Sequence, residues 1–255
     1  SMALGKSGNT TPRLSQATDR EFEKELEIFR TEADAAQQFF YAWMGVHAAA
    51  ADDKAVYRCL NSAALFWNTN LGALQTATFV TLGRIFDQNS IHNVGRLLKL
   101  AQDNPQIFSK AALALRKQGK NKTPPDWLDD YMRHVHVPKP HDFRRLRSYV
   151  SKHRRIYERN YRDLRNYIFA HKGVSDPEAV AALFAKTNIR ELERLLGFLS
   201  RLHDALWNTL MNGRKPVLRP RRYSVKSMRE KPSPHHRGAA VHERILHEAG
   251  RFLSD

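Results

Sequence analysis

The sequence predicts an all-α protein built as an antiparallel bundle of long helices. Apolar residues recur at intervals of three and four over several long segments, which is the period of a helix with one buried face. No segment shows the apolar–polar alternation of a strand, and no repeat of roughly 20–50 residues is visible. We therefore expect a helical-bundle domain over residues 18–212, between a disordered segment at 1–17 and a basic, Pro-containing tail at 213–255.

The first two helices are expected to be long and unbroken. Thr18 and Glu21 have capping-box spacing, which places the first helix between Thr18 and about Ala51. The second helix is expected over residues 52–87. It carries polar residues seven positions apart, which therefore share one face: Asn61, Asn68 and Gln75. This row fits either a polar groove beside a functional site or hydrogen bonds between packed helices.

Cap residues and prolines divide the rest of the chain. Ser90 and Asn188 are expected to cap helices, and Pro105 is expected to begin one. Gly173 is well placed to end a long basic helix in a left-handed turn. Further helices are expected at 90–103, 105–119, 126–134, 141–172 and 239–253. Two more are expected to begin at residues 176 and 188.

The net charge of +16 is concentrated in two segments. Residues 140–172 hold ten Lys and Arg against three acids, and residues 213–255 hold eleven against four, so each segment carries +7. Such patches attract polyanions, most often nucleic acid, although a solvated basic surface has the same composition. We expect RNA to be the partner and assign its binding to Arg162, Lys172, Arg219, Arg221 and Arg222.

Cysteine and apolar content exclude several classes of protein. Cys59 is the single cysteine, which excludes an intrachain disulfide and a cysteine-rich zinc site. The longest apolar stretch, 39–51, is too short to cross a bilayer. We expect a cytoplasmic protein that makes no contact with a membrane.

Residues 165–171, Arg-Asn-Tyr-Ile-Phe-Ala-His, carry the chemistry of the chain. RNA contains its own nucleophile, the 2′-hydroxyl, so a nuclease needs only proton transfer and stabilisation of the charged phosphorane. His171 is suited to act as general acid or base near neutral pH, and Arg165 is suited to hold the phosphate oxygens. This chemistry needs no metal, and its products are a 2′,3′-cyclic phosphate and a 5′-hydroxyl.

Spacing alone does not bring these two residues together. Six positions at about 100° each place Arg165 and His171 about 120° apart around a regular helix. A distorted last turn before Gly173, or a symmetric dimer with both pairs at one cleft, would join them. The structural alternative is a surface arginine and a histidine at the end of a helix.

Two segments together resemble a known family. The Arg-Asn-spacer-His pattern is similar to the signature of the HEPN superfamily (higher eukaryotes and prokaryotes nucleotide-binding). The pairing of residues 80–87, Val-Thr-Leu-Gly-Arg-Ile-Phe-Asp, with 164–172 resembles its abortive-infection U-type branch. The similarity covers roughly residues 18–212. It implies an all-α, dimeric, metal-independent endoribonuclease of a prokaryotic defence or toxin system, with an antitoxin or other defence protein as partner.

The resemblance assigns roles residue by residue. Arg165 and His171 match the catalytic pair, and Asn166 matches the polar residue that sets local geometry beside the arginine. Arg84 and Asp87 match a recurring segment, where we expect a structural ion pair within one helix. Asn68, from the polar row, is added as a supporting residue. Gly173 stands where some HEPN toxins carry a tyrosine that a partner enzyme modifies, so that mode of silencing is not expected.

Other interpretations remain open at this point. Many HEPN-like domains have lost catalysis, which leaves an RNA- or nucleotide-binding module or a scaffold subunit of a defence complex as alternatives. His134, His136 and His141 are close enough in sequence for zinc but lie in a Pro-rich segment without a nearby cysteine. We expect no metal and no cofactor. The basic tail either tracks an RNA backbone, clasps a second protomer or is a solubilising segment.

Overall fold

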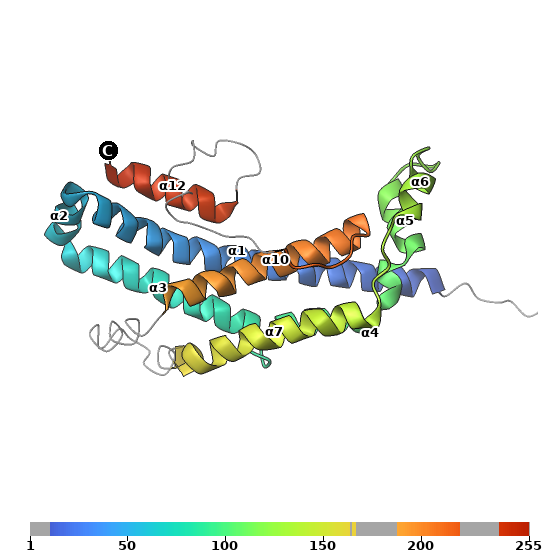
Figure 1. Ribbon diagram of the computed structural model, residues 1–255, viewed down its shortest axis with the longest axis horizontal. Coiled ribbons are helices and arrows are strands. Elements are labelled where there is room, and N and C mark those ends of the chain that lie inside the picture. The colour runs from blue at the N-terminus through green and yellow to red at the C-terminus, as the bar shows by residue number, and fades with distance from the viewer. Residues whose placement is uncertain (1–10, 164, 167–187, 220–239, 255) are drawn as a thin grey trace, which may run out of the picture.

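The computed structural model describes residues 11–163, 165–166, 188–219 and 240–254, the first seven of them by their backbone alone. All regular secondary structure in these residues is helical, which confirms the all-α prediction. Long helices pack against one another along the length of the molecule (Figure 1). They are α1 (Thr11–Asp52), α3 (Ala64–Phe86), α7 (Pro140–Asn160) and α10 (Ile189–Asn212).

The predicted boundaries of the first two helices are wrong. α1 begins at Thr11, seven residues before the expected capping box, so residues 11–17 are helical. The expected helix over 52–87 is two helices, because Ala63 leaves helical geometry at φ −125° and ψ 46°. The first of them, α2 (Lys54–Ser62), is capped by the Asp53 carboxylate, which accepts from the Ala55 amide. The break separates Asn61 from the rest of its polar row.

α10 forms as the sequence predicts and occupies the centre of the core. The side chain of Asn188 caps it by accepting from the backbone amide of Glu191. Gly213 ends it in the left-handed conformation, at φ 56°. Burial of a leucine side chain stabilises the fold by about 1.5–3 kcal/mol, so the row of buried leucines on α10 stabilises the bundle. Its buried leucines are Leu192, Leu195, Leu196, Leu199, Leu202, Leu206 and Leu210.

The middle of the chain is built from short helices with different caps from those expected. Asn93, rather than Ser90, caps α4 (Val94–Asp103), because its side chain accepts from the Arg96 amide at 3.0 Å. Pro105 begins only a 3₁₀ turn, η1 (Pro105–Phe108), and Ser109 caps the helix that follows. The helices beyond η1 are α5 (Lys110–Gln118) and α6 (Leu128–Arg133).

The long basic helix expected over 141–172 is also interrupted. α7 ends at Asn160, and Tyr161 has a φ of −128° and a ψ of −16°. The described residues beyond it, 162–163 and 165–166, are helical again. Gly173 and the helix expected from residue 176 lie outside the described residues. Arg165 therefore stands on a separate segment that starts after a turn in the chain.

The terminal helix is present and packs on the bundle. α12 (Val241–Ser254) contacts α1 along its length (Figure 1). Gly45 of α1 permits this approach, because a Cβ there would lie 3.0 Å from the Cβ of Ala249. His242 is buried, with its Nδ1 3.0 Å from Oε1 of Gln37. The end of the predicted basic tail is thus packed against the helical core.

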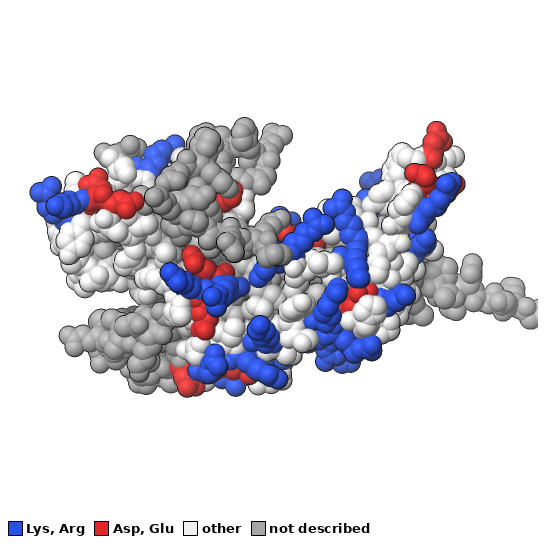
Figure 2. All heavy atoms as spheres, in the orientation of Figure 1, with Lys and Arg blue, Asp and Glu red and all other residues white. Residues whose placement is uncertain are grey.

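The surface over α7 and α10 is strongly basic. Figure 2 shows Lys and Arg side chains gathered over these two helices on the face in view. Between the helices, the ring of His153 stacks on Phe198 with centroids 3.7 Å apart and planes at 5°. Among the described residues, none of the helices combines the length and apolar character needed to cross a bilayer.

Candidate functional site

Two tyrosines fix the end of α7 against α3. The ring of Tyr157 lies against Phe86 with centroids 5.7 Å apart, and the ring of Tyr161 stacks on Phe79 at 5.3 Å. The Tyr161 hydroxyl also donates to Oε1 of Glu191 in α10, at 2.9 Å. Burial raises the pKa of Tyr161, so this hydroxyl stays protonated and keeps donating. Three helices are therefore locked together at the point where α7 stops.

Arg165 lies one turn beyond this point and reaches the end of α3. Its backbone amide donates to the Tyr161 carbonyl at 3.0 Å, which starts the new helical segment. Its Nη1 lies 2.6 Å from Oδ2 of Asp87, the residue that caps α3. Both side chains are about four-fifths buried, at 21% and 20% exposure. The predicted catalytic arginine is thus held in place by a predicted supporting residue.

Gly83 provides the space for the arginine stem. A Cβ built at this position would lie 2.7 Å from Cδ of Arg165 and 2.9 Å from the hydroxyl of Tyr157. Contacts this short do not occur between real atoms of these types, so any side chain at Gly83 would displace the arginine or the tyrosine. The glycine inside α3 is therefore explained by the close approach of Arg165.

The Asp87 carboxylate is kept ionised. Its Oδ1 accepts from the Asn89 amide at 3.1 Å, and this bond lowers the pKa of Asp87, opposed by partial burial and assisted by Arg165 and Arg162. Burial raises the pKa of the neighbouring Tyr157 phenol, which is therefore neutral. The site thus pairs one carboxylate with one guanidinium beside a neutral hydroxyl.

The expected ion pair between Arg84 and Asp87 is wrong. Arg84 turns instead to Glu32 of α1, with Nη2 and Nε at 2.8 and 2.9 Å from Oε2. Its Nη2 also donates to Oγ1 of Thr81 at 3.2 Å. Arg84 therefore joins α3 to α1, while Asp87 joins α3 to the segment that carries Arg165.

The remaining predicted residues are not all brought to this site. Asn166 is exposed and helical beside Arg165. Arg162 is partly exposed and bonded to Glu158 at 2.6 Å. Asn68 is exposed on α3, 15 residues before Gly83 and therefore about 22 Å away along the helix axis, so it does not belong here. Arg219 is exposed after α10, and the predicted residues outside the described ranges are His171, Lys172, Arg221 and Arg222.

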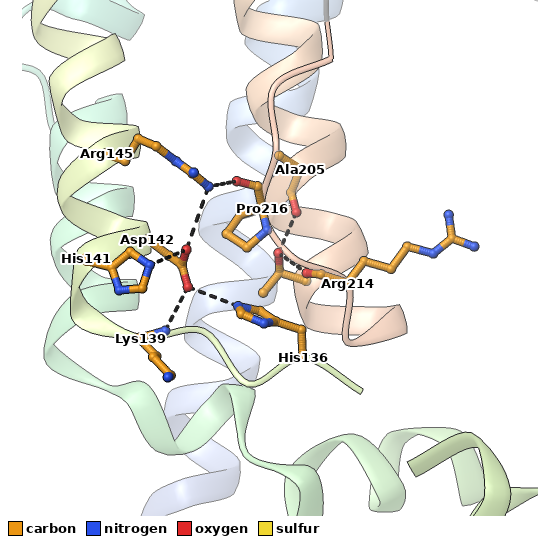
Figure 3. Close-up of polar contacts among 9 residues, drawn as sticks. His136, Lys139, His141, Asp142, Arg145, Ala205, Arg214 and Pro216 are labelled. Carbon is orange, nitrogen blue, oxygen red and sulfur yellow. Dashed lines mark hydrogen bonds and ion pairs between the residues drawn. The ribbon is translucent and has the colours of Figure 1, made fainter. Parts of the chain in front are cut away.

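A second charged cluster surrounds Asp142 at the start of α7 (Figure 3). The carboxylate is completely buried, with Oδ2 3.0 Å from both Nε2 of His136 and the backbone nitrogen of Lys139. Nε2 of His141 and Nη2 of Arg145 lie 3.3 and 3.7 Å from Oδ1. Burial alone would raise the pKa of Asp142, but the bonds from Lys139 and His136 and the nearby histidines hold it below its usual value.

This cluster joins chain segments that are distant in sequence. Nη2 of Arg145 donates to the carbonyl of Pro216 at 3.0 Å, and the backbone amide of His136 donates to the carbonyl of Gly213 at 2.8 Å. The first contact, drawn in Figure 3, ties the start of α7 to the segment that follows α10, and the second ties the residues before α7 to the cap of α10. The cluster therefore holds the fold together at this end of the bundle.

The zinc alternative is not supported by the geometry of the three histidines. Ring nitrogens of His136 and His141 face Asp142, and Nδ1 of His134 lies 3.1 Å from the Asp130 carbonyl. Within the part of the chain that the structure describes, no group of three or more His, Cys, Asp or Glu could hold a metal ion.

Several residues of these sites were not predicted, although some left a signal in the sequence. Gly83 sits inside an apolar helical pattern, where glycine costs about 1 kcal/mol relative to alanine and often marks a close approach. Pro140 is the first residue of α7 and Asp142 is the third. The third position is where a capping box carries its acidic residue. The roles of Tyr157 and Glu32 depend on partners far away in sequence, and no local pattern indicates them.

Comparison with known proteins identifies the fold and its branch. The family model described as HEPN_AbiU2, AbiU2, matches residues 19–228, a range that begins within α1, extends beyond α10 and includes the whole 165–171 motif. Searches of curated proteins and of solved structures return no match. The match confirms the resemblance seen in the two sequence segments. The chain belongs to the AbiU2 family of abortive-infection HEPN proteins.

Proposed function

We propose that this protein is a metal-independent endoribonuclease of a prokaryotic defence system. It cleaves RNA by attack of the 2′-hydroxyl on the adjacent phosphorus, which releases the 5′-oxygen and leaves a 2′,3′-cyclic phosphate. His171 transfers the protons and Arg165 stabilises the charge on the phosphate. The observation that carries the proposal is the fixed position of Arg165 at the break after α7, within a family match that also includes His171.

The surroundings of Arg165 suit an electrostatic role. Asp87 and the close approach to Gly83 hold the Arg165 side chain in one place, so little reorganisation is needed when charge develops nearby. A guanidinium has five N–H donors, so one group can bind a carboxylate and a phosphate together. One-fifth of the side chain is exposed to solvent, which gives an anion access to it.

The reaction needs two proton transfers. One group removes the proton of the 2′-hydroxyl, and another delivers a proton to the departing 5′-oxygen. In a homodimer with both motifs at one cleft, the two copies of His171 would divide these tasks. We include this dimer in the proposal, with RNA as the substrate.

The second candidate is an inactive HEPN module that binds RNA or a nucleotide. The observation that favours it is the 2.6 Å ion pair itself, because an arginine engaged by Asp87 also has a structural use. In that case Arg165 would stabilise the fold, and His171 would be dispensable for function.

Incubation of the purified protein with total RNA in EDTA separates the two candidates. We expect cleavage by the wild type and by His134→Ala, a control at an exposed histidine, and none by His171→Ala or Arg165→Ala. Arg165→Lys should restore little activity, since lysine lacks the planar fork. RNA affinity in the absence of any cleavage by the wild type would favour the binding module.

A further inference from the structure

One face of α7 carries a row of cations. Arg144, Arg147, Lys152, Arg155 and Arg159 are all exposed. At about 100° per residue they project within an arc of about 140°, and the row is about 22 Å long. We call these five residues the α7 basic face. The basic surface over α7 and α10 in Figure 2 gives its setting.

The charges of the α7 basic face are not neutralised by acids of the described chain. Cations elsewhere pair with carboxylates, as in Arg84 with Glu32 and Lys99 with Asp103. In the described residues, no ion pair joins any member of the α7 basic face to Asp or Glu, and Arg147 and Arg159 donate only to neutral side chains. Among the described residues, these five positive charges therefore have no acidic partner.

The acids of α7 itself are engaged elsewhere. Asp142 is buried among its own partners, and Glu158 is bonded to Arg162. Like charges three and four positions apart on a helix repel one another, so this arrangement does not serve the stability of the isolated helix. A phosphate backbone laid along α7 would remove that repulsion and release counterions.

Residue type and position favour RNA as that anion. Four of the five cations are arginines, whose planar fork matches phosphate oxygens. Tyr149, 41% exposed on the same helix, offers a ring on which a base can stack. The row ends at Arg159, just before the break at Tyr161, and Arg165 lies on the segment after that break.

We propose that the α7 basic face binds the backbone of single-stranded RNA and leads the strand to Arg165. Delivery of the strand to a cleavage site rests on the proposed function, whereas RNA binding by the α7 basic face does not. An acidic protein partner is the competing occupant.

Binding of a fluorescent single-stranded 2′-O-methyl RNA to the full chain tests this surface. Such RNA has no free 2′-hydroxyl and is not cleaved by the proposed reaction, so binding is measured apart from catalysis. The test variant is Arg144→Ala/Lys152→Ala/Arg155→Ala, because none of these side chains makes a hydrogen bond or ion pair within the described residues. The control is Lys54→Ala/Lys120→Ala/Lys122→Ala, which removes the same charge from exposed positions outside α7.

We expect the α7 variant to bind at least tenfold more weakly, with its salt slope reduced by about two, or roughly 0.7 per lost phosphate contact. The control should keep its affinity within about twofold. An equal loss in both variants, or an unchanged affinity of the α7 variant, would overturn the proposal, and the second result would point to a protein partner. Circular dichroism and Tm establish that both variants fold.

The same variants keep this proposal separate from the proposed function. If the wild type binds the 2′-O-methyl RNA through α7 but cleaves no RNA, the nuclease proposal fails and the binding surface stands. If the α7 variant cleaves ordinary RNA with unchanged KM, the surface fails and the nuclease stands. A raised KM with unchanged kcat supports both.

Discussion

An aspartate lies beside an arginine near each end of α7, but the two sites differ in their exposure to solvent. Asp142 is wholly buried and surrounded by donors and cations. Asp87 is one-fifth exposed and pairs with an arginine that also reaches solvent. The first arrangement holds the fold, and the second leaves a fixed cation where a ligand can reach it. Solvent exposure therefore distinguishes the candidate functional site at Arg165 and Asp87 from the structural cluster around Asp142.

The largest expected effect is the loss of stability in Asp142→Ala. Asp142 is completely buried and accepts from His136 and from the Lys139 amide, so its removal should cost about 3 kcal/mol, or roughly 1.5 kcal/mol for each hydrogen bond to a charged acceptor that is lost. Asp87→Ala, at a more exposed pair, should cost about 1–2 kcal/mol. Urea denaturation of the two variants measures this order. Equal losses would contradict the distinction between a closed and an open site.

Acid should destabilise the fold at both sites. The pKa values of Asp142 and Asp87 are lowered in the fold, so both carboxylates stabilise it above their unfolded pKa of about 3.9. This stability is lost as the pH falls through the lower folded pKa values. We expect the difference in Tm between wild type and Asp142→Asn to shrink as the pH falls below about 4. A difference that grows over that acidic range would refute the assignment.

Gly83→Ala tests the open site without touching a charge. The added Cβ would fall below 3 Å from both Arg165 and Tyr157, so we expect a cost of about 1–3 kcal/mol and a loss of RNA cleavage. Gly72→Ala in the same helix has nothing within 4 Å and should stabilise the protein by up to about 1 kcal/mol. Thermal unfolding and the cleavage assay together report both changes. If the two variants behave alike, the close approach of Arg165 is not as described.

The smallest effect is expected for Arg84→Ala. Its pair with Glu32 is half exposed on the arginine side, and such pairs contribute about 0–1 kcal/mol. Cleavage should be unchanged, since Arg84 faces α1 rather than Arg165. A variant as inactive as Arg165→Ala would show that the two arginines act together.

Local patterns predicted the elements whose causes are local. Asn188 and the leucines of α10 are examples, because a cap and a 3.6-residue period lie within one segment. The breaks at Ala63 and Tyr161 have no Gly or Pro to announce them. Tyr161 is set by stacking on Phe79, a contact across 82 positions of sequence. Tertiary contacts of Tyr161 thus accompany the end of the predicted basic helix, and among the described residues the break at Ala63 has no such contact to explain it.

Two residues that the structure pairs were named from the sequence, but the pairing between them was not. Arg165 could be named from the motif, and Asp87 from the second segment. Their ion pair was not foreseen, because spacing suggested Arg84 as the partner of Asp87. Arg84 is three residues before Asp87 in the sequence but pairs with Glu32 of α1, so Arg165 from beyond α7 pairs with Asp87 instead.

The stacked histidine in the middle of α7 has a consequence for how RNA binding responds to pH. Burial against Phe198 lowers the pKa of His153, with Arg201 and Lys152 acting in the same direction and a bond to the Tyr149 carbonyl opposing them. His153 therefore stays neutral to a lower pH than an ordinary histidine, so near neutral pH the positive charge at the centre of α7 comes from arginine and lysine. RNA capture along this helix should be indifferent to pH in a range where a histidine-dependent reaction is not, so the two steps would respond separately to cellular acidification.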